Sequence, residues 1–148
     1  MHDPADVHSL QVNYAWPLQK DTKGNLWIGT IGGGLHQLNL STGQMQRWLA
    51  QVSETDVESI LLDEKGHVWI GGEGLYDFDP VSRQVIHYDV TDGLQSNSFK
   101  VGAAFRGADQ TLYWGGANGI TFSNHRYLPR TVLLHWCELR DSAFTISM

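Results

Sequence analysis

The residues of this sequence best suited to bind a small polar ligand are four side chains that fall in predicted loops. Each ends in a carboxylate or a carboxamide, groups that exchange hydrogen bonds with a polar ligand. They are Glu73, Gln95, Asn97 and Asn118. Because loops on a rigid scaffold carry function more often than strands do, these four are our candidate ligand-binding residues. The alternative is that they are ordinary solvated loop residues.

The other reactive side chains do not follow a catalytic or metal-binding pattern. The seven histidines include no pair at the spacing of metal ligands. The single Cys137 excludes an internal disulfide and has no base beside it in the sequence. Three aspartates, Asp21, Asp63 and Asp109, fall in predicted turns, where aspartate hydrogen-bonds nearby backbone, so they do not indicate a glycosidase pair. We therefore expect no catalytic residue, no metal and no cofactor.

Composition and charge restrict the class of protein. The 148 residues are 41% hydrophobic and 18% charged, which is typical of a chain that packs a core. The net charge of −6 argues against a nucleic-acid partner, which would select a basic face. We find neither an apolar run long enough for a membrane segment nor a signal-peptide pattern in this chain.

One nine-residue segment recurs along the chain and sets the spacing of the loops. Residues 21–29 read DTKGNLWIG, residues 63–71 read DEKGHVWIG, and residues 107–115 form a weaker copy, GADQTLYWG. Equivalent positions hold an aromatic residue (Trp27, Trp69 and Tyr113), the glycine that ends the turn (Gly24 and Gly66) and the glycine of the strand (Gly29, Gly71 and Gly115). The aromatic residues lie 42 and 44 positions apart, a period that indicates stacked supersecondary units. Because every copy has one, we expect all three aromatic residues to be buried between units rather than to serve as platforms for sugars.

Short strand patterns surround each copy of this repeat. Segments of β-branched and aromatic residues alternate with turn-forming residues, and apolar residues do not recur at helical spacing. Four short antiparallel strands in about 40 to 45 residues make one blade of a β-propeller. We predict an all-β chain of about three blades. Since propellers usually close with roughly four to eight blades, we expect a fragment of a larger propeller.

The third copy of the turn has an unusual residue. Gln110 stands where Gly24 and Gly66 end the first two turns. If the turn is the same in all three copies, Gln110 takes the positive φ that glycine adopts at little cost.

The repeat resembles the two-component regulator propeller repeats, which occur in extracytoplasmic sensor regions of bacterial hybrid two-component systems. The resemblance rests on residues 21–30 (DTKGNLWIGT) and 33–35 (GGL) and extends over residues 2–129. Residues 92–99 (DGLQSNSF) and 115–120 (GGANGI) resemble the last such repeat. In that family a β-sandwich domain follows it, and a transmembrane helix, a histidine kinase and response-regulator modules follow further on.

This resemblance implies a division of the chain into five parts. They are a linker from a preceding repeat (1–12), blade 1 (13–56), blade 2 (57–98), blade 3 as the last repeat (99–130), and the start of the β-sandwich or an unassigned tail (131–148). The remaining blades and the β-sandwich of the same protein would then be partners of this segment.

The function implied by the resemblance is a non-catalytic, periplasmic segment that senses a ligand and passes the signal to a phosphorelay. Such sensors respond to oligosaccharides, so an oligosaccharide is the expected partner. The kinase would lie outside this chain. Two alternatives remain: a propeller enzyme of the lyase type, which would need a histidine and a carboxylate on the loops, and a protein-interaction propeller, which would expose aromatic residues there.

Overall fold

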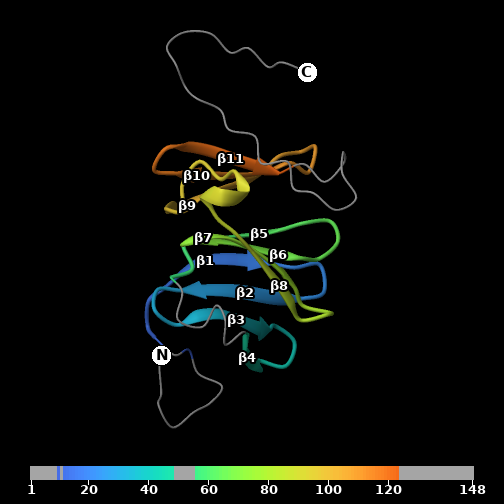
Figure 1. The fold of residues 1–148 in the computed structure, drawn as a ribbon. Coiled ribbons are helices and arrows are strands. Elements are labelled where there is room, and N and C mark those ends of the chain that lie inside the picture. Colours follow the sequence, from blue (N-terminus) through green and yellow to red (C-terminus); the bar gives the residue numbers. More distant parts are fainter. Residues whose placement is uncertain (1–9, 11, 49–55, 124–148) are drawn as a thin grey trace.

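The computed structural model describes residues 10, 12–48 and 56–123. Outside these residues lie most of the predicted linker, the loop before blade 2, Cys137 and the predicted start of a β-sandwich. The described chain forms three antiparallel sheets that follow one another in chain order (Figure 1). The predicted all-β fold with four-stranded antiparallel units is confirmed for the first two sheets.

Each sheet is a meander, in which consecutive strands pair. Sheet 1 contains β1 (Ala15–Lys20), β2 (Asn25–Thr30), β3 (Gly34–Asn39) and β4 (Met45–Trp48). Sheet 2 contains β5 (Ser59–Leu62), β6 (Val68–Gly72), β7 (Gly74–Asp79) and β8 (Gln84–Tyr88). Sheet 3 contains β9 (Phe99–Arg106), β10 (Leu112–Gly116) and β11 (Gly119–Ser123), and the short 3-10 helix η1 (Val90–Asp92) precedes it.

The first strands of the three sheets lie side by side. Contacts join β1, β5 and β9 to one another. Two backbone hydrogen bonds link neighbouring sheets there: Val57 N donates to Thr30 O at 3.1 Å, and Gly102 N donates to Glu58 O at 2.9 Å. These strands are therefore the inner edge of the stack.

Apolar side chains fill the two spaces between the sheets. Trp27, which is 2% exposed, packs against Trp48 and Phe78 between sheets 1 and 2. Trp69, which is fully buried, packs against Trp114 between sheets 2 and 3. The prediction that Trp27 and Trp69 are buried on the second strand of their sheets is confirmed.

The prediction that Tyr113 is equally buried is wrong. Tyr113 has the expected place on β10 but is half-buried, and it contacts Phe105 and Phe122 of its own sheet. Successive side chains of a strand point to opposite faces, so Trp114 faces sheet 2 and Tyr113 faces away from it. The equivalent faces of sheets 1 and 2, which carry Trp27 and Trp69, are each covered by the next sheet. Within the described residues, no sheet covers this face of sheet 3.

The glycine that follows the repeated Trp-Ile pair allows neighbouring sheets to approach closely. A Cβ built at Gly29 would lie 2.3 Å from Val57 Cγ1 and 2.4 Å from Pro17 Cγ. Those distances are too short for any side chain. Gly115 lies on sheet 3, whose outer face no described sheet covers. A Cβ built at Gly115 would lie 3.1 Å from its nearest neighbour, Ala103 Cβ.

We expect Gly29→Ala to lower the free energy of unfolding by about 1–3 kcal/mol, because the added methyl group overpacks the contact with Val57. Chemical denaturation of the variant measures this. Gly115→Ala is the matched control, with the smaller loss. Equal losses for the two variants would contradict the role of the neighbouring sheet.

The turns before the second strands have the same geometry in all three sheets. The φ angles are 87° at Gly24, 86° at Gly66 and 70° at Gln110. The prediction of a positive φ at Gln110 is confirmed. The Gln110 side chain accepts hydrogen bonds from the Arg106 guanidinium, which holds it across the turn.

We expect Gln110→Gly to raise the free energy of unfolding by about 0.5–1 kcal/mol, since glycine relieves the strain of the left-handed backbone. The lost hydrogen bond to Arg106 is exposed and offsets only part of this gain. Thermal unfolding compares the variant with Gln110→Ala, which loses the same bond and keeps the strain. A Gln110→Gly variant no more stable than Gln110→Ala would contradict the strain argument.

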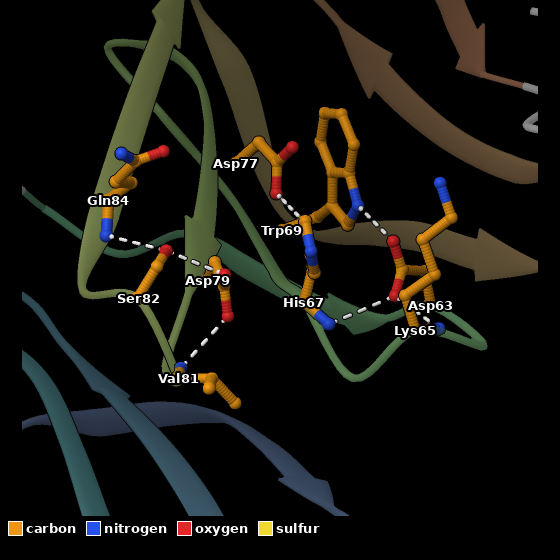
Figure 2. Close-up of polar contacts among 9 residues, drawn as sticks. All are labelled: Asp63, Lys65, His67, Trp69, Asp77, Asp79, Val81, Ser82 and Gln84. Carbon is orange, nitrogen blue, oxygen red and sulfur yellow. Dashed lines mark hydrogen bonds and ion pairs between the residues drawn. The ribbon is translucent and has the colours of Figure 1, made fainter. Parts of the chain in front are cut away.

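The aspartate that opens each of the first two turns also binds the repeated tryptophan. Asp63 Oδ1 accepts from the backbone N–H groups of Lys65 and His67, and Asp63 Oδ2 accepts from Trp69 Nε1 at 3.2 Å (Figure 2). Asp21 makes the same bond to Trp27 Nε1 at 3.2 Å. These bonds tie each turn to the core.

Hydrogen bonds of the same kind favour the ionised form of the Asp21 carboxyl. Burial tends to raise the pKa of this carboxyl, but hydrogen bonds from Asn25, Lys23 and Trp27 together outweigh it and hold the pKa below its ordinary value. In the third copy Gly107 occupies the equivalent position, so Tyr113 has no such partner. Asp109, two residues later, instead accepts from Thr111 N and Thr111 Oγ1.

Candidate functional site

The four predicted ligand-binding residues lie close together at one end of sheets 2 and 3. Glu73 joins β6 to β7, and it forms an isolated bridge with Ser98 just before β9. The neighbouring Gly74 N donates to Asn97 O at 2.7 Å. Asn118, between β10 and β11, donates from its backbone N–H to Gln95 Oε1 at 3.0 Å. Three loops separated in the sequence thus meet at one place.

Part of the polar capacity of these residues holds the loops together. Asn97 Oδ1 accepts from Val90 N at 2.9 Å, which fixes η1 against the loop. Gln95 is only 8% exposed, and its Nε2 has no hydrogen-bond partner among the described residues. The Glu73 side chain is exposed. The Glu73 carboxylate is therefore open to a ligand at this end, whereas Gln95 Nε2 is a buried donor packed against Gly116.

Two residues beside Glu73 were missed by the sequence analysis. His87 on β8 has its Nε2 3.0 Å from Glu73 O, and its ring stacks on Tyr76 with centroids 4.3 Å apart. Tyr76 and His87 are direct cross-strand partners. Only the strand pairing brings His87 to this loop, since 14 residues separate it from Glu73 in the sequence.

The remaining described histidines on strands or turns have other environments. His36 is 1% exposed, and neither ring nitrogen has a hydrogen-bond partner in the described part of the chain. Burial, and after it the positive charge of Arg47, lower the pKa of His36, against a nearby backbone carbonyl that raises it. His67 pairs with Asp77, its Nδ1 2.8 Å from Asp77 Oδ1 (Figure 2). Within residues 10, 12–48 and 56–123, no three His, Cys, Asp or Glu side chains are grouped as metal ligands.

A cavity of about 500 Å³ lies at the other end of sheet 1. It is lined by Asn25, Gln37, Asn39, Gln44, Met45, Gln46 and Arg47. Several of its polar groups already serve the fold: Gln37 Oε1 accepts from Trp48 Nε1, and Asn39 Oδ1 accepts from the backbone of the following turn. It includes none of the predicted ligand-binding residues, so we place the candidate site at the loops. The described residues contain no helix that could cross a membrane.

Comparison with known proteins is consistent with this fold. Residues 9–32 match the model of the two component regulator propeller family. Among curated proteins, histidine kinase P4 of Formosa agariphila is 28% identical over 89 residues, which are 55% of this chain and 6% of that protein. The chain thus spans a small part of the relative that it matches.

Solved structures with the same fold include extracellular domains of bacterial one- and two-component systems and two lyases. The extracellular domain of a one-component system of B. thetaiotaomicron is 30% identical with a TM-score of 0.67, over 84% of this chain and 17% of that one. The extracellular domain of a hybrid two-component system of B. thetaiotaomicron is 23% identical with a TM-score of 0.65, over 82% and 17%. Virginiamycin B lyase of Staphylococcus aureus is 14% identical with a TM-score of 0.60, over 80% and 42%, which shows the shared propeller fold alone.

Proposed function

We propose that this chain, which carries a two-component regulator propeller repeat, is a ligand-sensing segment in the extracytoplasmic region of a hybrid two-component signalling protein. The observation that carries the proposal is the likeness of 84% of the chain, at 30% identity, to the extracellular domain of a bacterial one-component system. Sensor propellers of this kind are far longer than this chain, so the remaining blades belong to the same protein. A following β-sandwich, a membrane anchor and the histidine kinase of the phosphorelay complete the proposed protein.

The proposed ligand is an oligosaccharide that binds where the loops meet. The Glu73 carboxylate accepts hydrogen bonds from sugar hydroxyls, and the carboxamides of Gln95, Asn97 and Asn118 add donors and acceptors around it. Ligand sites usually combine a few such polar groups with apolar surface. Because propeller loops converge at one end of the ring, the full site also includes loops from blades outside this chain.

The segment itself is proposed to be non-catalytic. A lyase would need a histidine that can move a proton at the ligand. Among the histidines that the structure describes, His87 contacts these loops, with its Nε2 against the Glu73 carbonyl oxygen. This contact fits a structural role for His87.

Calorimetry on the whole extracytoplasmic region, with a panel of neutral oligosaccharides, tests the proposal. We expect at least one sugar to bind, and we expect Glu73→Gln combined with Asn118→Ala to weaken binding about tenfold, since each lost polar contact is worth roughly 0.5–1.5 kcal/mol. Val81→Ala, an exposed change on the far side of sheet 2, is the control. Binding unaffected by the double change would remove the loop site, and cleavage of the bound sugar would support an enzyme instead.

A further inference from the structure

Three residues at equivalent positions of the inner strands have very different side chains. Trp16 on β1, Glu58 just before β5 and Lys100 on β9 are each 42 positions from the next, the spacing that also separates Trp27 from Trp69. Trp16 and Lys100 are the second residues of β1 and β9, and Glu58 directly precedes β5. They are therefore the same position in three successive sheets.

The pairing of the strands supports the equivalence of Trp16 and Lys100. In sheet 1, Ala15 pairs with Thr30 and Leu18 pairs with Ile28, so two residues of β1 lie between these pairs. At the equivalent place in sheet 3, Phe99 pairs with Gly116 and Ala104 pairs with Trp114, so four residues of β9 lie between the pairs. The two additional residues of β9 come after Lys100 and explain why the last aromatic spacing is 44 rather than 42. They form a bulge at Gly102, which has a φ of 72°.

The bulge brings the three positions together. Gly102 N donates to the backbone oxygen of Glu58 at 2.9 Å. A Cβ built at Gly102 would lie 3.2 Å from Trp16 Nε1, so the indole of the first sheet reaches the bulge of the third. Burial, and less strongly Asp56, raise the pKa of the Glu58 carboxyl, while the charge of Lys100 lowers it, as expected for a nearby ammonium group.

Among the described residues, packing between the sheets does not bury Trp16 or Lys100, and Lys100 Nζ donates a long hydrogen bond of 3.4 Å to Ser98 Oγ. Trp16 is 57% exposed, and Lys100 is exposed as well. The repeat position that packs between sheets 1 and 2 and between sheets 2 and 3 is aromatic in every copy (Trp27, Trp69 and Tyr113), although Tyr113 has no described sheet to pack against. Here the copies hold an aromatic ring, an acid and an amine. Such variety at one repeated position is expected where the three copies contact different parts of one ligand.

We propose that Trp16, Glu58 and Lys100 form a sugar-binding surface at the inner edge of the stack, an inference that rests on the proposed oligosaccharide ligand. The apolar face of one pyranose ring lies on the Trp16 indole, an aromatic ring with an apolar body and a polar edge. Glu58 accepts hydrogen bonds from the sugar hydroxyls and Lys100 donates to them. The inner strands begin at the same end as the candidate loops, because Ile31 N, in the loop after β2, donates to Tyr14 O just before β1. The surface therefore continues the loop site toward the centre.

The test follows the indole N–H signals of the ¹⁵N-labelled chain by NMR during titration with cellotetraose and, separately, maltotetraose. We expect the Trp16 signal, assigned by its loss in Trp16→Phe, to move with increasing sugar at millimolar concentrations of at least one probe. The signals of Trp27 and Trp69, which are bound to aspartates, should not move. Trp16→Ala is expected to weaken binding about tenfold, and Glu58→Gln or Lys100→Gln several-fold.

Phe105→Ala provides the matched control, since Phe105 is 66% exposed but lies on the outer face of sheet 3. Binding should be unchanged in this variant, and an equal loss in Phe105→Ala and Trp16→Ala would overturn the proposed surface. Movement of the Asn118 side-chain signals without movement of the Trp16 signal would also overturn it, while leaving the proposed function intact. If no signal moves with either sugar, the surface is contradicted, and calorimetry on the whole extracytoplasmic region decides separately whether an oligosaccharide is the ligand.

Discussion

Replacing Trp69 with alanine is expected to lower the free energy of unfolding by about 3–5 kcal/mol, the usual cost of removing a buried aromatic side chain. Trp69 is fully buried between sheets 2 and 3. Its ring stacks on Tyr88 with centroids 6.1 Å apart and meets Trp114 at 5.6 Å. The substitution leaves a cavity among these rings and removes the donor that Asp63 binds. The expected loss is a large part of the stability of a small domain.

Tyr113→Ala is the matched control, because Tyr113 has the same place in the repeat but is half-buried. Urea denaturation followed by far-ultraviolet circular dichroism measures both variants. We expect a clearly smaller loss for Tyr113→Ala, since no described sheet covers that face. If Trp69→Ala loses the overall fold, Trp69→Phe, which fills most of the space, gives a measurable value. Equal losses at the two positions would contradict the burial difference between them.

The sequence could predict the fold because the repeat carries several independent signals that agree. The 42-residue period, the turn glycines and the strand patterns all indicate the same four-stranded unit. The alignment of repeats could also place Gln110 at a positive φ, since backbone geometry is local. Burial is not local. Tyr113 shares the register of Trp27, yet its exposure depends on whether another sheet follows, and register alone does not contain that information.

The candidate site could be predicted only in part, for a similar reason. Turn composition placed Gln95 and Asn118 in loops, and the structure joins them by a hydrogen bond. The contact of His87 with Glu73 depends on which strands pair. The contact of Trp16 with Gly102 depends on how sheets 1 and 3 sit beside each other and on a two-residue bulge. Contacts of this kind follow from the packing of whole units, which no single repeat specifies.

Asp63→Ala is expected to lower the free energy of unfolding by about 2–4 kcal/mol, the second largest effect. The Asp63 carboxylate is nearly buried and accepts from two backbone N–H groups and from Trp69 Nε1. Its removal leaves the buried indole N–H without this acceptor, and an unsatisfied buried donor costs roughly 1–3 kcal/mol. The loss of hydrogen bonds from the turn to a charged acceptor accounts for the rest.

Asp109→Ala separates the two contributions, because Asp109 accepts from Thr111 in the third turn, where the aromatic residue of the repeat is Tyr113, which has no indole N–H. We expect this control to cost about 1 kcal/mol, as for an ordinary turn hydrogen bond. Denaturation of Asp63→Ala in a Trp69→Phe background then tests the bond itself. Since phenylalanine has no N–H for Asp63 to accept, the cost of Asp63→Ala should fall toward that of Asp109→Ala. An unchanged cost in that background would show that Asp63 stabilises the turn alone and that the link from turn to core contributes nothing.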